Sequence, residues 1–407
     1  MKKLFEAWNQ ISLVKRIVVG LIIGTVLGLV CPGTGGVAIL GDAFVGALKA
    51  VAPLLVFFLI VSSLCYSGKS HGGVIRTVII LYMFSTFLAA VIAVVSSMLF
   101  PVSLTLSAEA ADMSAPQGIA DVLRNLLMNI VSNPVKSLME ANYIGILFWA
   151  VLLGFGLRGA GEATKKMLND LSGAFSRAVT WIISFAPFGI LGLVYNTVST
   201  NGLSAFTEYG KLLAVLVGSM LFIYFVTNPI LVFWCIRKNP FPLIFKCLKK
   251  SAITAFFTRS SAANIPINME ACAEMGLDKD TYSVTIPLGS AINMDGAAIT
   301  ITVMTLATAH TLGINVDIPS AIVLSILATL SACGASGVAG GSLLLIPMAC
   351  GLFGIPNEVA MQVVGIGFII GVIQDSVETA LNSSSDLLLS ASAEFRQWRR
   401  ENKEIVF

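Results

Sequence analysis

The chain has 407 residues, of which 56% are hydrophobic and only 12% are charged. Soluble proteins carry about 25% charged residues, so half that share cannot cover a soluble surface of this size. The composition therefore excludes a soluble protein of two or three domains and a disordered chain. It also excludes a nucleic-acid binder, because the net charge is +3 and no basic stretch dominates.

Seven cysteines and two histidines are scattered along the chain. No two cysteines have the spacing of a zinc knuckle or of a redox pair, so we interpret them as small apolar residues of packed helices. With so few histidines, a zinc site is not expected.

The first apolar stretch follows a basic N-terminus and has some features of a signal peptide. No small-x-small cleavage site follows it, and Cys31 is preceded by Leu29 and Val30 rather than by the small residues of a lipoprotein site. We therefore expect this stretch to remain as a first membrane helix.

Apolar stretches, most of them long enough for a membrane helix of about 20 residues, recur to the end of the chain. The basic and non-basic loops between them alternate, which predicts cytoplasmic termini and six ordinary spans up to residue 236. The stretch 143–157 is short, and we expect it to be kinked or broken. The stretches are roughly 13–31, 39–67, 74–100, 143–157, 174–198, 209–236, 241–275, 284–313, 321–354 and 360–393.

Two later stretches are interrupted, one by the polar run 258–266 and one by the glycine-rich run 331–342. Unpaired backbone in lipid costs several kcal/mol per group, so each stretch predicts two half-helices that meet at a re-entrant tip. Each is followed by one span, which makes an inverted repeat typical of secondary transporters. Glycine-rich helix packing is the alternative. The predicted fold is an all-α integral membrane protein with eight transmembrane helices and two re-entrant helical hairpins.

The final span carries polar residues that are costly in lipid, at about 2.5–3.5 kcal/mol for each charge. At about 100° per residue, these side chains fall within an arc of about 100° on one helix face. A structural salt bridge explains one acid but hardly three, so the face predicts a binding site. Its members are Asp375, Glu378, Thr379, Asn382 and Asp386.

The preceding span holds the run Asn-Met-Asp-Gly at 293–296, shortly after Pro287 and Gly289. This pattern predicts local unwinding, whose free carbonyls and carboxylate suit a cation such as Na⁺. The alternative is a polar group that joins two helices. A third polar cluster follows helical spacing in the third span, where Ser and Thr can also bond their own backbone. It consists of Tyr82, Ser85 and Thr86.

The expected site carries an excess of negative charge. Arg259 contributes +1 and four acids contribute −4, so the sum is −3 when all are ionised. In a low dielectric, bound cations or protons must offset this charge, which predicts cation coupling. The four acids are Asp295, Asp375, Glu378 and Asp386.

Together these motifs resemble the dicarboxylate/amino acid:cation symporter family, which has the glutamate-transporter fold. The likeness rests on the serine-bearing first tip, the 293–296 run, the glycine-rich second tip from Gly337 to Gly341 and the polar pattern of the last span. The chain is most similar to the bacterial branch that couples sodium to serine and threonine. The resemblance implies a non-enzyme that couples inward Na⁺ flow to uptake of these amino acids by elevator-type alternating access.

The resemblance also implies the substrate site. Asp375 would bind the ammonium group, with Thr379 beside it, and Asn382 would bind the α-carboxylate together with backbone amides near the first tip. The second tip would be the outer gate. The implied substrate-binding residues are Arg259, Ser260, Ser261, Val338, Gly341, Asp375, Glu378, Thr379 and Asn382.

Three sodium sites follow from the same resemblance. The first combines the Asp386 carboxylate with carbonyls of Gly289, Asn293 and Asn382. The second consists of Tyr82, Ser85, Thr86, Asn293 and Asp295. The third uses carbonyls near Ala291, Ala332, Cys333 and Ala335, with Met294 adjacent. Na⁺ is thus expected as the co-transported ion, with no organic cofactor.

One departure from the family concerns selectivity. Glu378 stands where members that carry acidic amino acids have an arginine, and a glutamate would repel a substrate carboxylate by about 1–4 kcal/mol at 4 Å. A small neutral side chain with a hydroxyl fits better, although Glu378 could instead, or also, pair with Arg259. Ala297 replaces a threonine common in members with acidic substrates, which again suggests an altered pocket. Ala291 replaces another family threonine, but the implied sodium contact there is made by the backbone, so the third sodium site is little affected.

The resemblance implies a homotrimer in the bacterial inner membrane, with a small neutral amino acid and membrane lipid, but no nucleic acid, as partners. The alternatives are a Na⁺- or H⁺-coupled symporter of another small amino acid or of a dicarboxylate. An intramembrane hydrolase using His310 is disfavoured, because His310 lies far along its span from the tips. The expected units are a scaffold (trimerisation) domain at 10–70 and 141–200, a transport domain at 74–101 and 205–393 with hairpins 241–275 and 321–354, and a cytoplasmic tail at 394–407.

Overall fold

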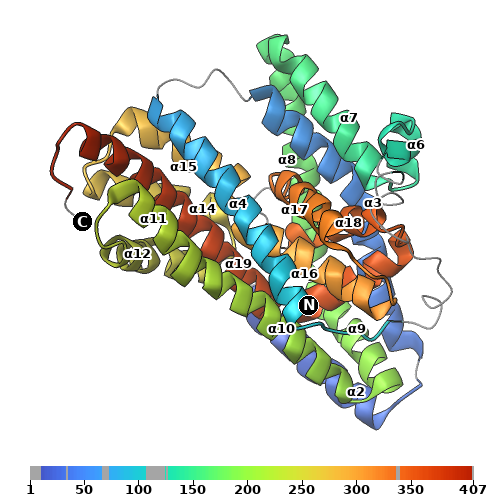
Figure 1. Cartoon of the computed structure of the whole chain (residues 1–407). Helices are drawn as coiled ribbons and strands as arrows, with labels where there is room; N and C mark the ends of the chain where they lie inside the picture. The colour runs from blue at the N-terminus through green and yellow to red at the C-terminus, as the bar shows by residue number, and fades with distance from the viewer. Residues whose placement is uncertain are drawn as a thin grey trace.

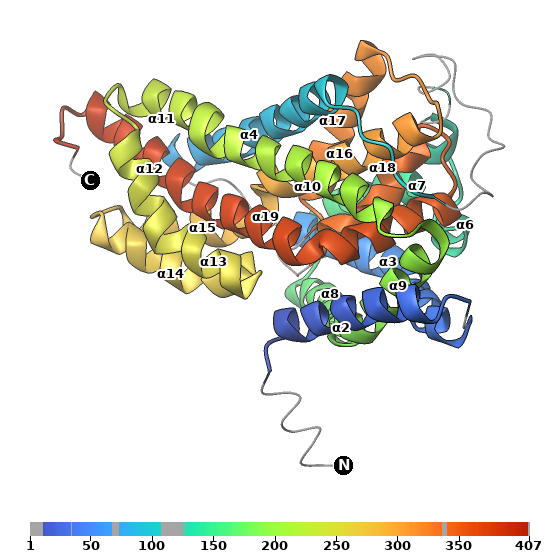
Figure 2. The same ribbon diagram turned by 90° about the horizontal axis from the view of Figure 1, so that it is seen from below.

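The computed structural model describes residues 11–33, 35–66, 73–106, 124, 127–335 and 340–405. Regular structure in these ranges is helical, without a strand. The helices form two groups, whose arrangement is visible in Figures 1 and 2. Val338, expected in the second tip, lies outside the described residues.

The first group packs mainly within itself, and its helices α2, α8 and α9 lie below the rest in Figure 2. Glycines let α2 and α9 touch: a Cβ at Gly20 would lie 2.2 Å from the carbonyl oxygen of Pro187, and one at Gly24 2.5 Å from that of Leu191. Small residues are a common means of close helix packing in membranes. The helices are α2 (Leu13–Val30), α3 (Gly35–Tyr66), α6 (Pro134–Met139), α7 (Tyr143–Gly156), α8 (Glu162–Ser184) and α9 (Ala186–Asn201).

Two predictions concern this group. The stretch 143–157 is short, as expected, but it forms the continuous helix α7 rather than a kinked or broken one. The stretch expected at 174–198 is longer and is split, because α8 and α9 meet at an angle of 55°. Pro187 stands in the first turn of α9 and lacks the N–H that a continuous helix would need, which explains the bend.

The second group surrounds α19, which runs beside α10, α11 and α4 in Figure 1. Two π-helical turns join its shorter pieces, Ile223–Thr227 between α10 and α11 and Leu248–Ala252 between α12 and α13. The helices are α4 (Gly73–Leu99), α10 (Ser204–Phe222), α11 (Asn228–Ile236), α12 (Phe241–Cys247), α13 (Ile253–Thr258), α14 (Ser261–Glu274), α15 (Lys279–Ile292), α16 (Asp295–Thr311), α17 (Ile318–Ala332), α18 (Ile346–Leu352) and α19 (Asn357–Arg400).

The breaks in the helices fall where the sequence predicts them. Between α13 and α14, Arg259 adopts a left-handed backbone with φ of 53°. The chain also leaves the helix between Ile292 and Asp295, which confirms the predicted unwinding. In the second hairpin, α17 ends at Ala332 and a 3₁₀ turn begins at Ser342 before α18.

Two helix ends differ from the prediction. α15 begins at Lys279 rather than near 284, because Asp278 caps it by accepting a hydrogen bond from the Thr281 amide at 3.1 Å. α19 continues to Arg400, past the expected end near 393. Both added segments are polar, so a search for apolar stretches does not detect them.

The hydrophobic lengths agree with a protein that crosses a membrane several times. The described residues hold five helices long and apolar enough to span, or six when α8 and α9 are taken as one bent span. The helical, multi-span class of the prediction is therefore confirmed. α16 is buried on all sides along most of its length, with 15 of its 17 residues buried.

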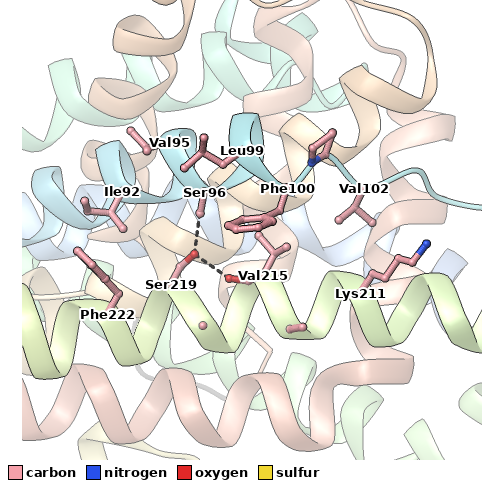
Figure 3. A pocket seen from close by; sticks show the side chains of 13 residues that line it. Ile92, Val95, Ser96, Leu99, Phe100, Val102, Lys211, Val215, Ser219 and Phe222 are labelled. Carbon is pink, nitrogen blue, oxygen red and sulfur yellow. Dashed lines mark hydrogen bonds between the residues drawn. The ribbon is translucent and has the colours of Figure 1, made fainter.

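A groove of about 860 Å³ lies between the end of α4 and α10 (Figure 3). It is lined mainly by apolar side chains, with Lys211 at one end and a hydrogen bond of 2.7 Å between Ser96 Oγ and Ser219 Oγ. None of the predicted site residues lines it, so its size does not mark the polar centre of the molecule.

The two groups meet at a second cavity of about 790 Å³ between α3, α9 and the start of α19. Lys49 of α3 forms an ion pair of 2.8 Å with Glu358 of α19 at this boundary. The Lys49 side chain is 38% exposed and that of Glu358 is 71% exposed, so water screens the pair and it is a weak link between the groups.

Candidate functional site

The polar face of α19 meets three breaks: the α13–α14 tip, the α15–α16 break and the start of the second arm of the α17–α18 hairpin. At the centre, Arg259 Nε donates to Asp375 Oδ2 at 2.6 Å, and the backbone N–H of Gly340 donates to Asp375 Oδ1 at 3.2 Å. Asp375 therefore joins both hairpin tips. It is 3% exposed, so the carboxylate faces these donors away from bulk water.

The first tip is shaped as a helix start. Ser260 caps α14 by accepting a hydrogen bond from the Ala263 amide at 3.2 Å, and Ser261 is buried in the first turn. A helix start presents unpaired N–H groups and a positive dipole end, which suit an anion. Thr379 lies near Asp375 but donates to its backbone carbonyl at 2.8 Å, within α19.

Glu378 is held by neutral donors. Its Oε2 accepts from Thr300 Oγ1 at 2.7 Å, from Ser342 Oγ at 2.9 Å and from Gln374 Nε2 at 2.5 Å. Among the described residues, the ion pair of Arg259 is with Asp375 and not with Glu378. Gly341, expected at the substrate site, is buried directly before Ser342.

Asn382 binds the break between α15 and α16. Its Oδ1 accepts from the Gly296 amide at 2.7 Å, and its backbone carbonyl from Asn293 Nδ2 at 3.5 Å. Its Nδ2 donates to the Met294 sulfur at 3.5 Å. A thioether is a weak acceptor, so this amide N–H₂ retains capacity to bind a stronger one.

A first candidate cation group surrounds Asp386. Asn293 Nδ2 donates to Asp386 Oδ1 at 2.9 Å, and a Cβ at Gly289 would lie 2.8 Å from the same oxygen. Asn293 Oδ1 is buried and lacks a hydrogen-bond donor within the described part of the chain. A buried acceptor without a donor needs an explanation, and an oxygen-seeking cation supplies one.

A second group surrounds Asp295, in the first turn of α16. Ser85 Oγ donates to Asp295 Oδ2 at 2.8 Å and Thr86 Oγ1 to Oδ1 at 3.1 Å. The Tyr82 hydroxyl, predicted for this group, instead donates to the Asp386 carbonyl at 2.9 Å. The Asp295 carboxylate and the hydroxyl groups of Ser85 and Thr86 therefore bring oxygen atoms of three side chains together.

The third predicted group is looser. Cys333 Sγ lies 3.7 Å from the carbonyl oxygen of Ile292, which brings the end of α17 beside the α15–α16 break. Ala332, Ala335 and Met294 are buried here, and Ala291 is partly buried one residue before Ile292. These residues lie in one region, and their backbone carbonyl oxygens are the atoms available there as cation ligands.

The charges of the site are unbalanced. Arg259 pairs with Asp375, whereas no ion pair among the described residues involves the other three acids. Nor do those residues include a group of three or more His, Cys, Asp or Glu side chains that could hold a metal ion. The carboxylates of the other three acids are therefore met by neutral hydrogen-bond donors. The three acids are Asp295, Glu378 and Asp386.

Comparison with known proteins agrees with this arrangement. The sodium:dicarboxylate symporter family matches residues 13–394. The chain belongs to this family. It is 55% identical to the serine/threonine transporter SstT of Streptococcus thermophilus (strain ATCC BAA-250 / LMG 18311), over 98% of this chain and 100% of that protein. It is 54% identical to that of Bifidobacterium adolescentis, over 98% of this chain and 93% of that protein.

Membership of a symporter family confirms the resemblance inferred from the sequence, and with it the prediction of a transporter rather than an enzyme. Sequence reasoning did not find Thr300, Gln374 and Ser342, which hold Glu378. Gln374 lies one helical turn before Glu378, and Ser342 directly follows the glycine-rich tip, so their positions carried a weak signal. Thr300 is one of several similar threonines on α16 and carried none.

Proposed function

We propose that this chain couples inward Na⁺ flow to uptake of serine and threonine. The observation that carries the proposal is the carboxylate of Asp375 and the amide of Asn382 on one face of α19, each near a broken helix. One suits an ammonium group and the other a carboxylate, the two groups common to amino acids. The name of the full-length relatives, serine/threonine transporter, supports this substrate class.

Substrate binding begins with the ammonium group at Asp375, which shares or replaces the ion pair with Arg259. The α-carboxylate binds Asn382 Nδ2 and backbone N–H groups near Ser260 and Ser261, at the start of α14. The second hairpin, with Val338 and Gly341 at its tip, then closes over the substrate as the outer gate.

Selectivity against acidic substrates comes from Glu378. A second carboxylate at 4 Å costs about 1–4 kcal/mol, depending on the effective dielectric. Glu378 is 5% exposed, so water screens this repulsion poorly. Serine and threonine avoid the penalty, and their hydroxyl can donate to the glutamate.

Na⁺ binds near Asp295 and Asp386 and offsets the negative charge before the site closes. The hydroxyls of Ser85 and Thr86 and the unpaired Oδ1 of Asn293 support this role. A third Na⁺ binds backbone carbonyls near Met294, beside Ala291, Ala332, Cys333 and Ala335. Na⁺ is a transported ion here, so no organic cofactor takes part.

In the membrane, we propose eight transmembrane helices and two re-entrant hairpins, with both termini in the cytoplasm of a bacterial inner membrane. The first group of helices, with 10–70 and 141–200, is the static scaffold and joins three copies into a homotrimer. The second group, with 74–101 and 205–393, crosses as one unit, and the polar tail from 394 stays cytoplasmic. The weak Lys49–Glu358 link supports motion between the groups. The apolar groove of Figure 3 supports contact with lipid.

Uptake of radiolabelled serine into proteoliposomes tests the proposal, with an inward Na⁺ gradient and with choline in its place. Gradient-dependent uptake blocked by threonine but not by aspartate is the expected result. Strong inhibition by aspartate would move the chain to the acidic-substrate branch and refute the role given to Glu378. Uptake that follows a proton gradient without Na⁺ would favour the H⁺-coupled alternative.

A further inference from the structure

The carboxylate of Glu378 is held in an unusual way, by one of its two oxygens. Three donors from three elements converge on Oε2: Thr300 of α16, Gln374 of α19 and Ser342 of the 3₁₀ turn before α18. Gln374 Nε2 also donates to Thr300 Oγ1 at 2.7 Å, which fixes two of the donors against each other. None of the hydrogen bonds that the described residues make to this carboxylate ends on Oε1.

We propose that Thr300, Gln374 and Ser342 are positioning residues that make the site selective for substrates with a hydroxyl group. They fix the plane of the Glu378 carboxylate by Oε2 and leave Oε1 as the acceptor for the substrate hydroxyl. This inference rests on the function proposed above and adds the residues that set its selectivity.

The physical reason lies in the freedom of a glutamate side chain. Its last torsion has a broad, roughly two-fold preference, so an unsupported carboxylate rotates among many orientations. Three hydrogen bonds to one oxygen select a single orientation, and a pre-oriented acceptor binds more tightly because less freedom is lost. Serine and threonine can donate to Oε1. Alanine leaves this oxygen without a donor in a site closed to water, which is costly for a charged acceptor.

Ser342 connects this selectivity with the second hairpin. Thr300 belongs to α16 and Gln374 to α19, whereas Ser342 lies where the second arm of the hairpin begins. Gly340, two residues earlier, donates to Asp375. The set of three donors around Glu378 Oε2 is therefore complete only when this arm lies against α19. Closure of the hairpin and recognition of the substrate hydroxyl then occur together.

The test uses the purified full-length chain in lipid nanodiscs at saturating Na⁺, with serine and alanine as separate ligands. Thr300→Val and Ser342→Ala remove one donor each. Thr302→Val makes the same change on α16 at a buried hydroxyl that has no hydrogen-bond partner among the described residues. Ser325→Ala removes a hydroxyl of the same hairpin that, within the described part of the chain, donates to the carbonyl oxygen of Ala321 in its own helix at 2.9 Å. These two are the matched controls.

We expect Thr300→Val and Ser342→Ala to weaken serine binding about tenfold, as for a hydrogen bond to a charged group, and alanine binding less than twofold. Both controls keep the wild-type ratio. A merely structural role would lower both affinities together, and that result would overturn the inference. Wild-type protein with no Na⁺-dependent serine binding would overturn the proposed function itself, which separates the two failures.

Hydrogen exchange gives a second readout that does not depend on affinity. With serine and Na⁺ bound, the segment Ser342–Leu345 should gain protection in wild-type protein and in Ser325→Ala. In Ser342→Ala at saturating serine, this gain should be clearly smaller. An equal gain in protection in Ser342→Ala and Ser325→Ala would contradict the link between the three donors around Glu378 and closure of the hairpin.

Discussion

Gly296 lies where α16 packs tightly against α19, and replacing it with alanine tests how strongly the site depends on that contact. A Cβ at this position would lie 2.9 Å from both Cα and Cγ of Glu378 and 3.0 Å from its carbonyl oxygen. Ordinary contact begins at 3.4 Å, so the helices must separate by about 0.5 Å. The backbone of Glu378 cannot rotate away as a flexible side chain can.

Two opposing energies decide whether Gly296→Ala strengthens or weakens the packing of α16 on α19. Alanine favours a helix over glycine by about 1 kcal/mol, whereas overpacking in a filled core costs about 1–3 kcal/mol. The separation also lengthens the 2.7 Å hydrogen bond from the Gly296 amide to Asn382 Oδ1. We therefore expect Gly296→Ala to weaken serine binding by about five- to a hundredfold.

Binding of radiolabelled serine to the purified chain measures this effect, and thermal unfolding shows whether the variant is folded. Gly371→Ala is the matched control, because it lies on α19 and a Cβ there meets no atom within 4 Å. It should keep wild-type affinity and gain stability. Equal serine affinity in the two variants would refute the argument that the α16–α19 approach shapes the site.

Three further predictions concern other regions. Thr86→Val removes a 3.1 Å hydrogen bond to Asp295 and should raise the Na⁺ concentration for half-maximal serine uptake about tenfold; an unchanged value would remove Thr86 from the cation site. Gly24→Ala forces α2 from α9 and should cost about 1–3 kcal/mol, seen as a lower melting temperature in detergent; a wild-type value would contradict the close packing. Lys49→Ala breaks an exposed ion pair with Glu358 and should cost less than about 1 kcal/mol, and a larger loss in the same assay would mean that the pair holds the two groups together.

The sequence predicted the broken helices because the cost of bare backbone in lipid is large and local. A polar run ending at Pro266 cannot remain an ordinary span, and the left-handed Arg259 lies within it. The same reasoning located the break before Asp295. By contrast, the bend between α8 and α9 was missed, since a proline at a helix start is also compatible with a new, separate helix.

The candidate site could be predicted in part. The acids of α19 lie on one face because helical spacing fixes their directions, and that is a local property. The partners of Glu378 depend on the tertiary fold: Thr300 lies 78 residues away and Ser342 lies 36. The spacing of Gly20 and Gly24 was a readable sign of close helix packing, but it does not identify α9 as the helix that approaches.

The burial of α16 from Asp295 to Ala309 has a consequence for the surroundings in which the protein can work. Lipid reaches this helix only through its neighbours, whereas α2 presents Ile22 and Val26 with more than half of each side chain exposed. A thicker or stiffer bilayer acts first on such outer surfaces and, in the proposed mechanism, on the energy of moving one helix group past the other. Asp295, the proposed cation ligand, is separated from lipid by the helices around α16. The proposed mechanism therefore predicts that ion affinity and the speed of crossing vary independently when the lipids change.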